Sequence, residues 1–137
     1  MANAIYPKWK QAVMGHAANS SLLGGNLKAM IVDADAYVYS AAHEFLSSVP
    51  VGARISISAV MGGVSVADGV LDANDALFTA VVGPVSEVVA IILDTGDPAT
   101  TRLVAYLDTS YTNLPVTPVG GNIQIVWDDG ANKIFKL

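Results

Sequence analysis

The stretch SEVVAIILD, residues 86–94, holds six consecutive apolar residues, VVAIIL, between Glu87 and Asp94. A run of six fits a strand that is buried on both faces, whereas a membrane-spanning helix needs about 20 apolar residues. The stretch therefore predicts a central strand of a sheet. It also argues against a membrane protein, and no membrane partner is expected.

Shorter strands are predicted on both sides of this run. The segment RISISAV, residues 54–60, alternates isoleucine and serine, which is typical of a half-exposed antiparallel strand. The dipeptides Asp68-Gly69 and Asp129-Gly130 are hairpin signals. Six further segments have the composition of short strands or hairpins: residues 27–33, 63–73, 76–82, 101–109, 122–128 and 132–137.

The beginning of the chain has a different pattern. Residues 5–14 predict a short amphipathic helix, with Pro7 in its first turn and Ile5, Trp9 and Val13 on one stripe. Residues 15–26 are polar and rich in glycine, which predicts a linker. We therefore expect an N-terminal helix and linker arm, residues 1–26, and a β-sandwich domain, residues 27–137. The predicted class is all-β: an antiparallel β-sandwich or flattened barrel of about eight short strands.

Composition limits the classes of function. Hydrophobic residues make up 53% of the 137 residues and charged residues 14%, against about 25% charged residues in an average domain. Such a chain is expected to cover apolar surface in an assembly. The net charge is −5 and the basic residues are scattered, which argues against nucleic acid as a partner. Cysteine is absent, which excludes disulfides and thiolate metal sites, and Pro7 and Lys8 interrupt any signal-peptide core.

The adjacent His43 and Glu44 are the strongest candidates for chemistry. A zinc protease needs His-Glu-x-x-His, whereas this segment is HEFLS, and no Gly-x-Ser-x-Gly motif is present. The simpler prediction is a helical turn in which Ser40 is the cap, Glu44 completes a capping box, and Phe45 and Leu46 point inward. No catalytic residues and no enzymatic activity are predicted.

Acidic and aromatic residues have structural explanations as well. Three pairs of aspartates provide oxygen ligands, but none matches a calcium-binding loop, and turn formation is the expected role: Asp33 and Asp35, Asp72 and Asp75, and Asp94 and Asp97. A structural cation is the alternative. Tyrosines and tryptophans favour core and interface packing over a sugar-binding platform. The glycine-rich loops lack the spacing of phosphate-binding motifs. No cofactor or metal is predicted.

Four blocks of the sequence together resemble one family of virion proteins. They are MANAIYPKWKQAVM (1–14), YSAAHEFLSSVPVGARI (39–55), LDTGDPATTRLVAYLDT (93–109) and LPVTPVGGNIQIVWDDGANKIFKL (114–137). The chain resembles the capsid decoration, or cement, proteins of tailed bacteriophages nearly from end to end. The blocks are distinctive as a set, but they contain no catalytic motif.

The resemblance implies a β-rich protein, often a homotrimer, on the outer surface of the phage head. Such a protein is made in the host cytoplasm, binds the major capsid protein after the shell expands, and stabilises the shell by bridging capsomers. We expect the contacts at the two ends of the chain. The candidate contact residues are Ile5, Tyr6, Trp9, Val13, Ile134, Phe135 and Leu137.

Alternatives remain at this point. The N-terminal stripe either reaches a neighbouring subunit or closes the base of its own sandwich, and the terminal apolar residues are buried in the fold or in an interface. The chain as a whole is either a head decoration protein or a tail or fibre-associated module that binds host glycans. A small hydrolase is the least supported alternative, because the sequence lacks a recognisable site.

Overall fold

The computed structural model describes residues 3–108, 114–127, 130 and 133–137. Its largest element is a five-stranded antiparallel sheet with the strand order β1-β8-β7-β2-β3. The strands are β1 (Ala4–Ile5), β2 (Asn26–Val32), β3 (Arg54–Ile57), β7 (Val88–Asp94) and β8 (Arg102–Leu107). The predicted central strand is confirmed: β7 is the middle strand, and Val88 to Leu93 are at most 1% exposed.

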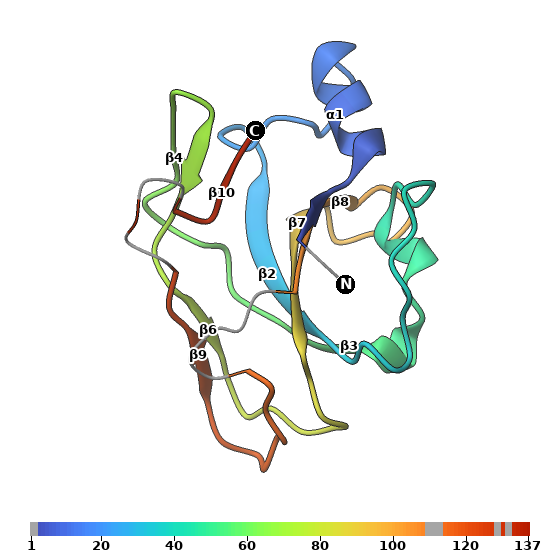
Figure 1. The fold of residues 1–137 in the computed structure, drawn as a ribbon, viewed down its shortest axis with the longest axis vertical. Helices are drawn as coiled ribbons and strands as arrows, with labels where there is room; N and C mark the ends of the chain where they lie inside the picture. Colours follow the sequence, from blue (N-terminus) through green and yellow to red (C-terminus); the bar gives the residue numbers. More distant parts are fainter. Residues whose placement is uncertain (1–2, 109–113, 128–129, 131–132) are drawn as a thin grey trace.

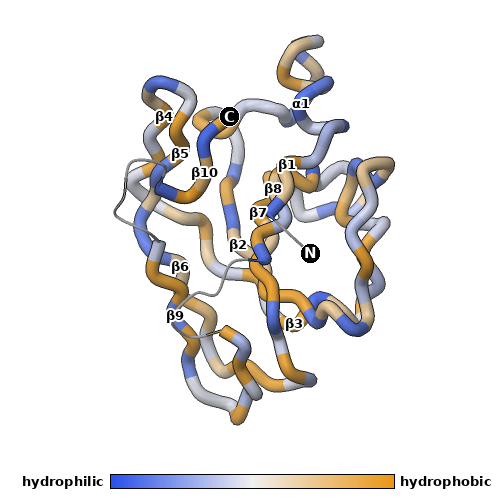
Figure 2. The backbone as a smooth tube through the Cα atoms, viewed as in Figure 1, coloured by the Kyte–Doolittle hydropathy of each residue, from blue (hydrophilic) through white to orange (hydrophobic). Residues whose placement is uncertain are grey.

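Two smaller antiparallel sheets complete the described fold. One has the order β10-β5-β4, and the other pairs β6 with β9. Figures 1 and 2 show both of them along one side of the five-stranded sheet, in a sandwich-like arrangement. The all-β prediction is therefore confirmed. The strands are β4 (Ser65–Ala67), β5 (Val70–Asp72), β6 (Ala76–Phe78), β9 (Ile123–Ile125) and β10 (Phe135–Lys136).

Among the described residues, one of the two predicted hairpins is formed. Asp68 and Gly69 both have positive φ, 52° and 79°, which is the backbone of a tight two-residue turn between β4 and β5. The Asp129-Gly130 hairpin was a wrong prediction, because β9 pairs with β6 and β10 pairs with β5. Asp129 itself lies outside the described residues.

The helix is shorter than predicted. Ile5 pairs with Ala105 as part of β1, and α1 therefore begins at Pro7 and ends at Met14. Pro7 occupies the first turn, where its missing N–H breaks no helical hydrogen bond. Of the predicted stripe, Trp9 is buried, Ile5 is half-buried and Val13 is exposed. Ala12 is buried beside Trp9 in place of Val13.

The segment that was predicted to be a linker is attached to the sheet. The side-chain amide of Asn19 donates hydrogen bonds to the carbonyl oxygens of Leu93, at 2.9 Å, and Thr100, at 3.2 Å. The guanidinium of Arg102 donates to the carbonyl of Ala18 at 2.9 Å. Tyr6 and Trp9, from this N-terminal part of the chain, belong to the same hydrophobic core as the strands.

Strand β3 forms an edge of the large sheet and is only partly covered. Ile57 is exposed, whereas Ser58, just beyond the strand, is buried. The Ser58 hydroxyl accepts a hydrogen bond from the Ala29 N–H and donates one to the Ala59 carbonyl. The predicted alternation therefore places a hydrogen-bonded serine inward at this edge. Two short 3₁₀ turns, Leu46–Ser48 and Val51–Ala53, precede β3.

Candidate functional site

Helix α1 is fixed to the body of the protein by Trp9. The indole N–H donates a hydrogen bond to the Ser20 carbonyl at 3.0 Å, and the indole ring meets the Phe135 ring edge-on, with 6.0 Å between centroids. Trp9 is only 2% exposed. One side chain therefore joins the helix, the turn after it and the last strand of the chain.

An open apolar groove of about 380 Å³ lies beside this junction. Its walls come from four separate parts of the chain: α1, the segment that follows it, β4 and the C-terminal residue Leu137. Figure 1 shows α1, β4 and the C-terminus at the same end of the molecule. Leu23 and Leu137 are the most exposed apolar lining residues, at 62% and 57%. The full lining is Trp9, Val13, His16, Ser20, Ser21, Leu22, Leu23, Val66 and Leu137.

The residues predicted as contacts divide into two groups. Four are buried against their own domain and present almost no surface: Tyr6, Trp9, Ile134 and Phe135. Ile5 is half-buried in β1. Only Val13 and Leu137 are exposed, and both line the groove. Of the seven candidate contact residues, only Val13 and Leu137 therefore present a side chain to a partner, and both do so as part of the groove.

Sequence reasoning missed the other apolar residues of the groove. Leu22 and Leu23 lie in the segment that was predicted to be a polar linker, and Val66 lies in β4. The adjacent leucines, in a segment rich in serine and glycine, could have indicated an apolar contact there. The sequence around Val66 contains no such indication, because only the tertiary fold brings Val66 to the groove.

A second apolar surface lies at the other end of the molecule. Two segments of the chain, residues 76–86 and 114–127, contain no charged residue. Each includes a loop, residues 79–85 in the first and 116–121 in the second, and these two loops are called here the end loops. Figure 1 places the end loops opposite α1 along the longest axis, and Figure 2 shows hydrophobic colouring at their tip. Val82, Val85 and Val119 are exposed there, Val119 to 90%.

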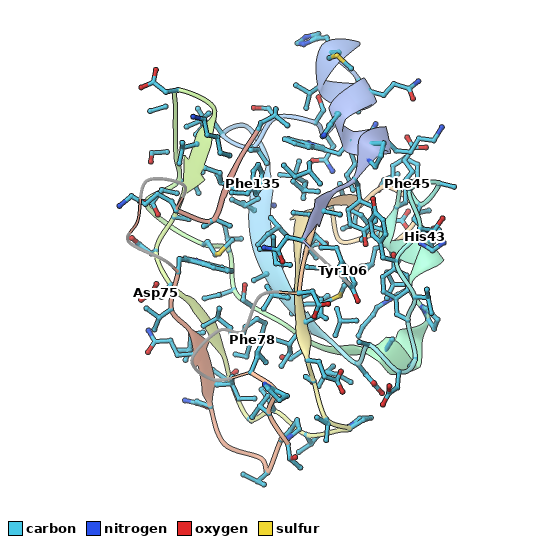
Figure 3. The ribbon with its side chains drawn as sticks, viewed as in Figure 1. His43, Phe45, Asp75, Phe78, Tyr106 and Phe135 are labelled. Carbon is cyan, nitrogen blue, oxygen red and sulfur yellow. The ribbon has the colours of Figure 1, made fainter. Side chains whose placement is uncertain are left out.

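His43 belongs to a hydrogen-bonded chain of aromatic residues. Its Nδ1 atom lies 2.8 Å from the Tyr37 hydroxyl, which lies 2.9 Å from the Tyr6 hydroxyl. Tyr37 also stacks on the His43 ring and contacts Tyr106. Burial, followed by the hydrogen bond with Tyr37, raises the pKa of Tyr6 far above its ordinary value. The arrangement holds the segment after β2 against β8 (Figure 3).

Glu44 has a different partner from the one predicted. Its carboxylate Oε1 accepts a hydrogen bond from Arg102 Nη1 at 3.0 Å, and the guanidinium of Arg102 lies over the Phe45 ring, 5.1 Å from its centroid. The capping-box role for Glu44 was therefore a wrong prediction, because its carboxylate pairs with Arg102 and residues 40–44 form no helix. Ser40 does accept a hydrogen bond from the Ala42 N–H. Leu46 is buried as predicted, and Phe45 is half-buried.

The acidic pair Asp33 and Asp35 lies close to a third carboxylate, that of Glu87. Ligand atoms of Asp33, Asp35 and Glu87 all lie within 4.8 Å of one another, where β2 ends and β7 begins. Asp33 Oδ1 accepts a hydrogen bond from the Asp35 N–H, and Glu87 Oε2 accepts one from the Ala34 N–H. Both bonds stabilise the turn itself, which is the predicted role of aspartate there.

The pair Asp94 and Asp97 also stabilises a turn. Asp94 Oδ2 lies 2.7 Å from Lys28 Nζ, and Asp94 Oδ1 accepts hydrogen bonds from the Gly96 N–H and the Thr101 hydroxyl. Burial alone would raise the pKa of Asp94, but these hydrogen bonds and the ammonium charge outweigh it and lower that pKa. Asp97 accepts from the Ala99 N–H.

The remaining pair lines a shallow polar pocket of about 430 Å³. Asp75 Oδ1 accepts a hydrogen bond from the Trp127 N–H, and Asp72 Oδ1 accepts one from the Ala73 N–H. The Trp127 indole is buried and donates to the Asn74 carbonyl. The pocket therefore offers carboxylate and amide groups, including that of Gln124, but no exposed ring face on which a sugar could stack.

No protein-family model matches the chain, and no curated protein is significantly similar to it. Within the described residues, no helix has the length and hydrophobicity needed to cross a membrane.

Proposed function

We propose that this chain is a bacteriophage head decoration protein, which binds the outside of the assembled capsid and stabilises it by bridging capsomers. The observation that carries the proposal is the pair of exposed apolar surfaces at opposite ends of the long axis, the groove and the end loops. A protein that assembles with several neighbours, further copies of itself among them, needs more than one contact surface. A monomer in solution rarely exposes extended apolar patches without a partner.

The resemblance of four sequence blocks to phage decoration proteins supports the same proposal. The partners are the major capsid protein and further copies of this chain in a homotrimer. A protein that binds only the assembled shell stabilises it through its binding free energy. Many copies around symmetry axes turn a modest contact into strong avidity. The role is structural and requires no catalysis.

Copy number and location test the proposal. The chain is quantified against the major capsid protein in purified particles, and a labelled chain is imaged on the heads and tails. A fixed simple ratio to the capsid protein, with label on the head, is the expected result. A few copies at the tail would overturn the proposal.

The polar pocket favours one alternative, a tail or fibre-associated module that binds host glycans. Carboxylate and amide groups, such as those of Asp72 and Gln124, are suited to binding sugar hydroxyls. This alternative predicts binding to glycans from the host surface, weakened by Asp72→Asn. The same variant leaves attachment to the head unchanged if the chain is a decoration protein.

A further inference from the structure

We propose that the end loops of one copy bind in the apolar groove of a second copy, so that the chain associates head to tail. This inference specifies the contact within the homo-oligomer of the proposed function, and in that sense rests on it. It is nevertheless tested on the free chain, without capsids.

The end loops have the composition of a contact surface. Their most exposed large hydrophobic residue is Val119, at 90%, and the next two residues in the chain are the exposed glycines Gly120 and Gly121. The absence of charge from residues 76–86 and 114–127 is notable in a chain with 19 charged side chains elsewhere, 7 basic and 12 acidic. Burying this surface against a partner therefore requires no desolvation of a charged side chain.

Backbone hydrogen bonds hold the end loops in one conformation. The Val81 N–H donates to the Gly121 carbonyl at 3.0 Å, and the Gly120 N–H donates back to the Val81 carbonyl at 2.7 Å. Ser86 and Val116 exchange a second reciprocal pair, at 2.9 and 3.0 Å. Because the loops are already ordered, their binding loses less conformational entropy than the binding of a flexible segment.

The groove matches the end loops in shape and in charge. It is concave, whereas the end loops form the projecting tip at the other end of the molecule. Its lining includes no lysine, arginine, aspartate or glutamate side chain. Its volume of about 380 Å³ falls in the range of about 300–1,000 Å³ that is usual for binding pockets. A valine-tipped, uncharged projection of a second copy is the occupant that this lining fits.

The position of the two surfaces determines the symmetry of the assembly. A contact between two different surfaces is heterologous, and repeated contacts close into a ring or extend into a filament. A homotrimer with this contact is a closed ring in which each copy uses one groove and one set of end loops. A two-fold dimer in which groove packs on groove, or end loops on end loops, would leave one of the two surfaces uncovered.

Two exposed residues provide the test, because replacing them disturbs little of the fold. Val119→Glu places a carboxylate on the end loops, and Leu23→Glu places one on the groove wall. Val38→Glu is the matched control, since Val38 is 79% exposed and belongs to neither surface. The mass of each purified chain is measured by sedimentation over a concentration series. Circular dichroism and thermal unfolding verify that each variant is folded.

The wild type and Val38→Glu are expected to form the same oligomer. Each of the other variants is expected to associate at least about tenfold more weakly, because the new carboxylate has no partner in an apolar contact. An equimolar mixture of Val119→Glu and Leu23→Glu is expected to form a dimer. In each mixed pair the intact groove of Val119→Glu can bind the intact end loops of Leu23→Glu. A contact of groove with groove, or of end loops with end loops, would not be restored between the two variants in this way.

A wild-type chain that stays monomeric throughout the series would overturn the inference, as would a mixture that forms no dimer. Binding to purified capsids separates this result from the proposed function. Capsid binding by a monomeric chain would contradict head-to-tail association alone. A head-to-tail oligomer that does not bind capsids would contradict the decoration role alone.

Discussion

The Trp9 and Phe135 rings meet edge-on, at 75° between planes and 6.0 Å between centroids, and so connect the first helix of the chain to its last strand. The indole of Trp9 also donates a hydrogen bond to the Ser20 carbonyl. The two chain ends, which sequence reasoning treated as candidate contacts with other proteins, thus contact each other. The groove exists because this junction holds its walls together.

Replacing Trp9 is expected to destabilise the whole fold. Trp9→Ala removes a buried aromatic ring and should lower the free energy of unfolding by about 3–5 kcal/mol. Trp9→Phe keeps a ring but loses the hydrogen bond to Ser20, and should cost about 1–2 kcal/mol. Urea unfolding measures both, with Met14→Ala as an exposed control from the same helix. Equal effects of Trp9→Ala and Met14→Ala would contradict the role of the junction.

The tyrosine cluster predicts loss of stability in alkali. Burial raises the pKa of Tyr6, and it also raises the pKa of Tyr37 and Tyr106, above their ordinary value of 10.0. In the unfolded chain these phenols ionise near that value, whereas the folded chain keeps them neutral. The stabilisation is therefore complete below about pH 10 and is lost as the pH rises further.

Urea unfolding at several values between about pH 8 and pH 11 measures this loss. Tyr6→Phe removes the most buried phenol of the cluster. That variant should be less stable at the lower pH, because the hydrogen bond with Tyr37 is absent. Its free energy of unfolding should also fall less steeply as the pH rises. An unchanged pH dependence would show that Tyr6 is not the group responsible.

Asp94 predicts a loss of stability at the acid end. Its pKa is lowered in the folded chain, as described above, below the value of 3.8 for an unperturbed carboxyl group. The carboxylate therefore stabilises the fold above about pH 4, and this stabilisation disappears as the pH falls through the lowered pKa. The effect should be about 1 kcal/mol or less, because the Lys28–Asp94 pair is partly exposed. Urea unfolding at neutral and acid pH measures this difference in the free energy of unfolding. The difference should be smaller in Asp94→Asn and unchanged in Asp97→Asn.

Local patterns predicted the parts of the fold that local forces determine. The run from Val88 to Leu93 is apolar on both faces, and only the middle of a sheet buries both faces of a strand. Asp68 and Gly69 were recognisable because few residues adopt positive φ at both positions of a tight turn. Neither inference needed any knowledge of distant parts of the chain.

The failed predictions all depend on distant parts of the chain. Asp129-Gly130 is also a turn signal, but β9 and β10 find their partners in different sheets. Glu44 fits a capping box in sequence, yet Arg102, 58 residues away, is its actual partner. The groove combines α1, the leucines after it, Val66 and Leu137, and no periodicity connects these segments. Three of the nine residues that line the groove, Trp9, Val13 and Leu137, could therefore be named from the sequence, whereas the position of the groove on the fold could not.

Two buried serines, Ser58 and Ser86, differ in the hydrogen bonds of their hydroxyl groups. Ser58 Oγ accepts from the Ala29 N–H at 3.0 Å and donates to the Ala59 carbonyl at 2.8 Å. Ser86 Oγ is fully buried and has no hydrogen-bond partner among the described residues. A buried polar group without a partner costs about 1–3 kcal/mol in desolvation, whereas a satisfied one contributes about 1 kcal/mol.

The same substitution should therefore have opposite effects at the two positions. Ser58→Ala leaves the Ala29 N–H without its acceptor and should lower the free energy of unfolding by about 1–2 kcal/mol. Ser86→Ala removes only the unsatisfied hydroxyl and should raise it by up to about 1 kcal/mol. Urea unfolding of the two variants and the wild type measures the direction and size of both changes in the free energy of unfolding. A loss of stability in Ser86→Ala as large as that in Ser58→Ala would mean that the Ser86 hydroxyl binds a partner, such as a buried water, that stabilises the fold.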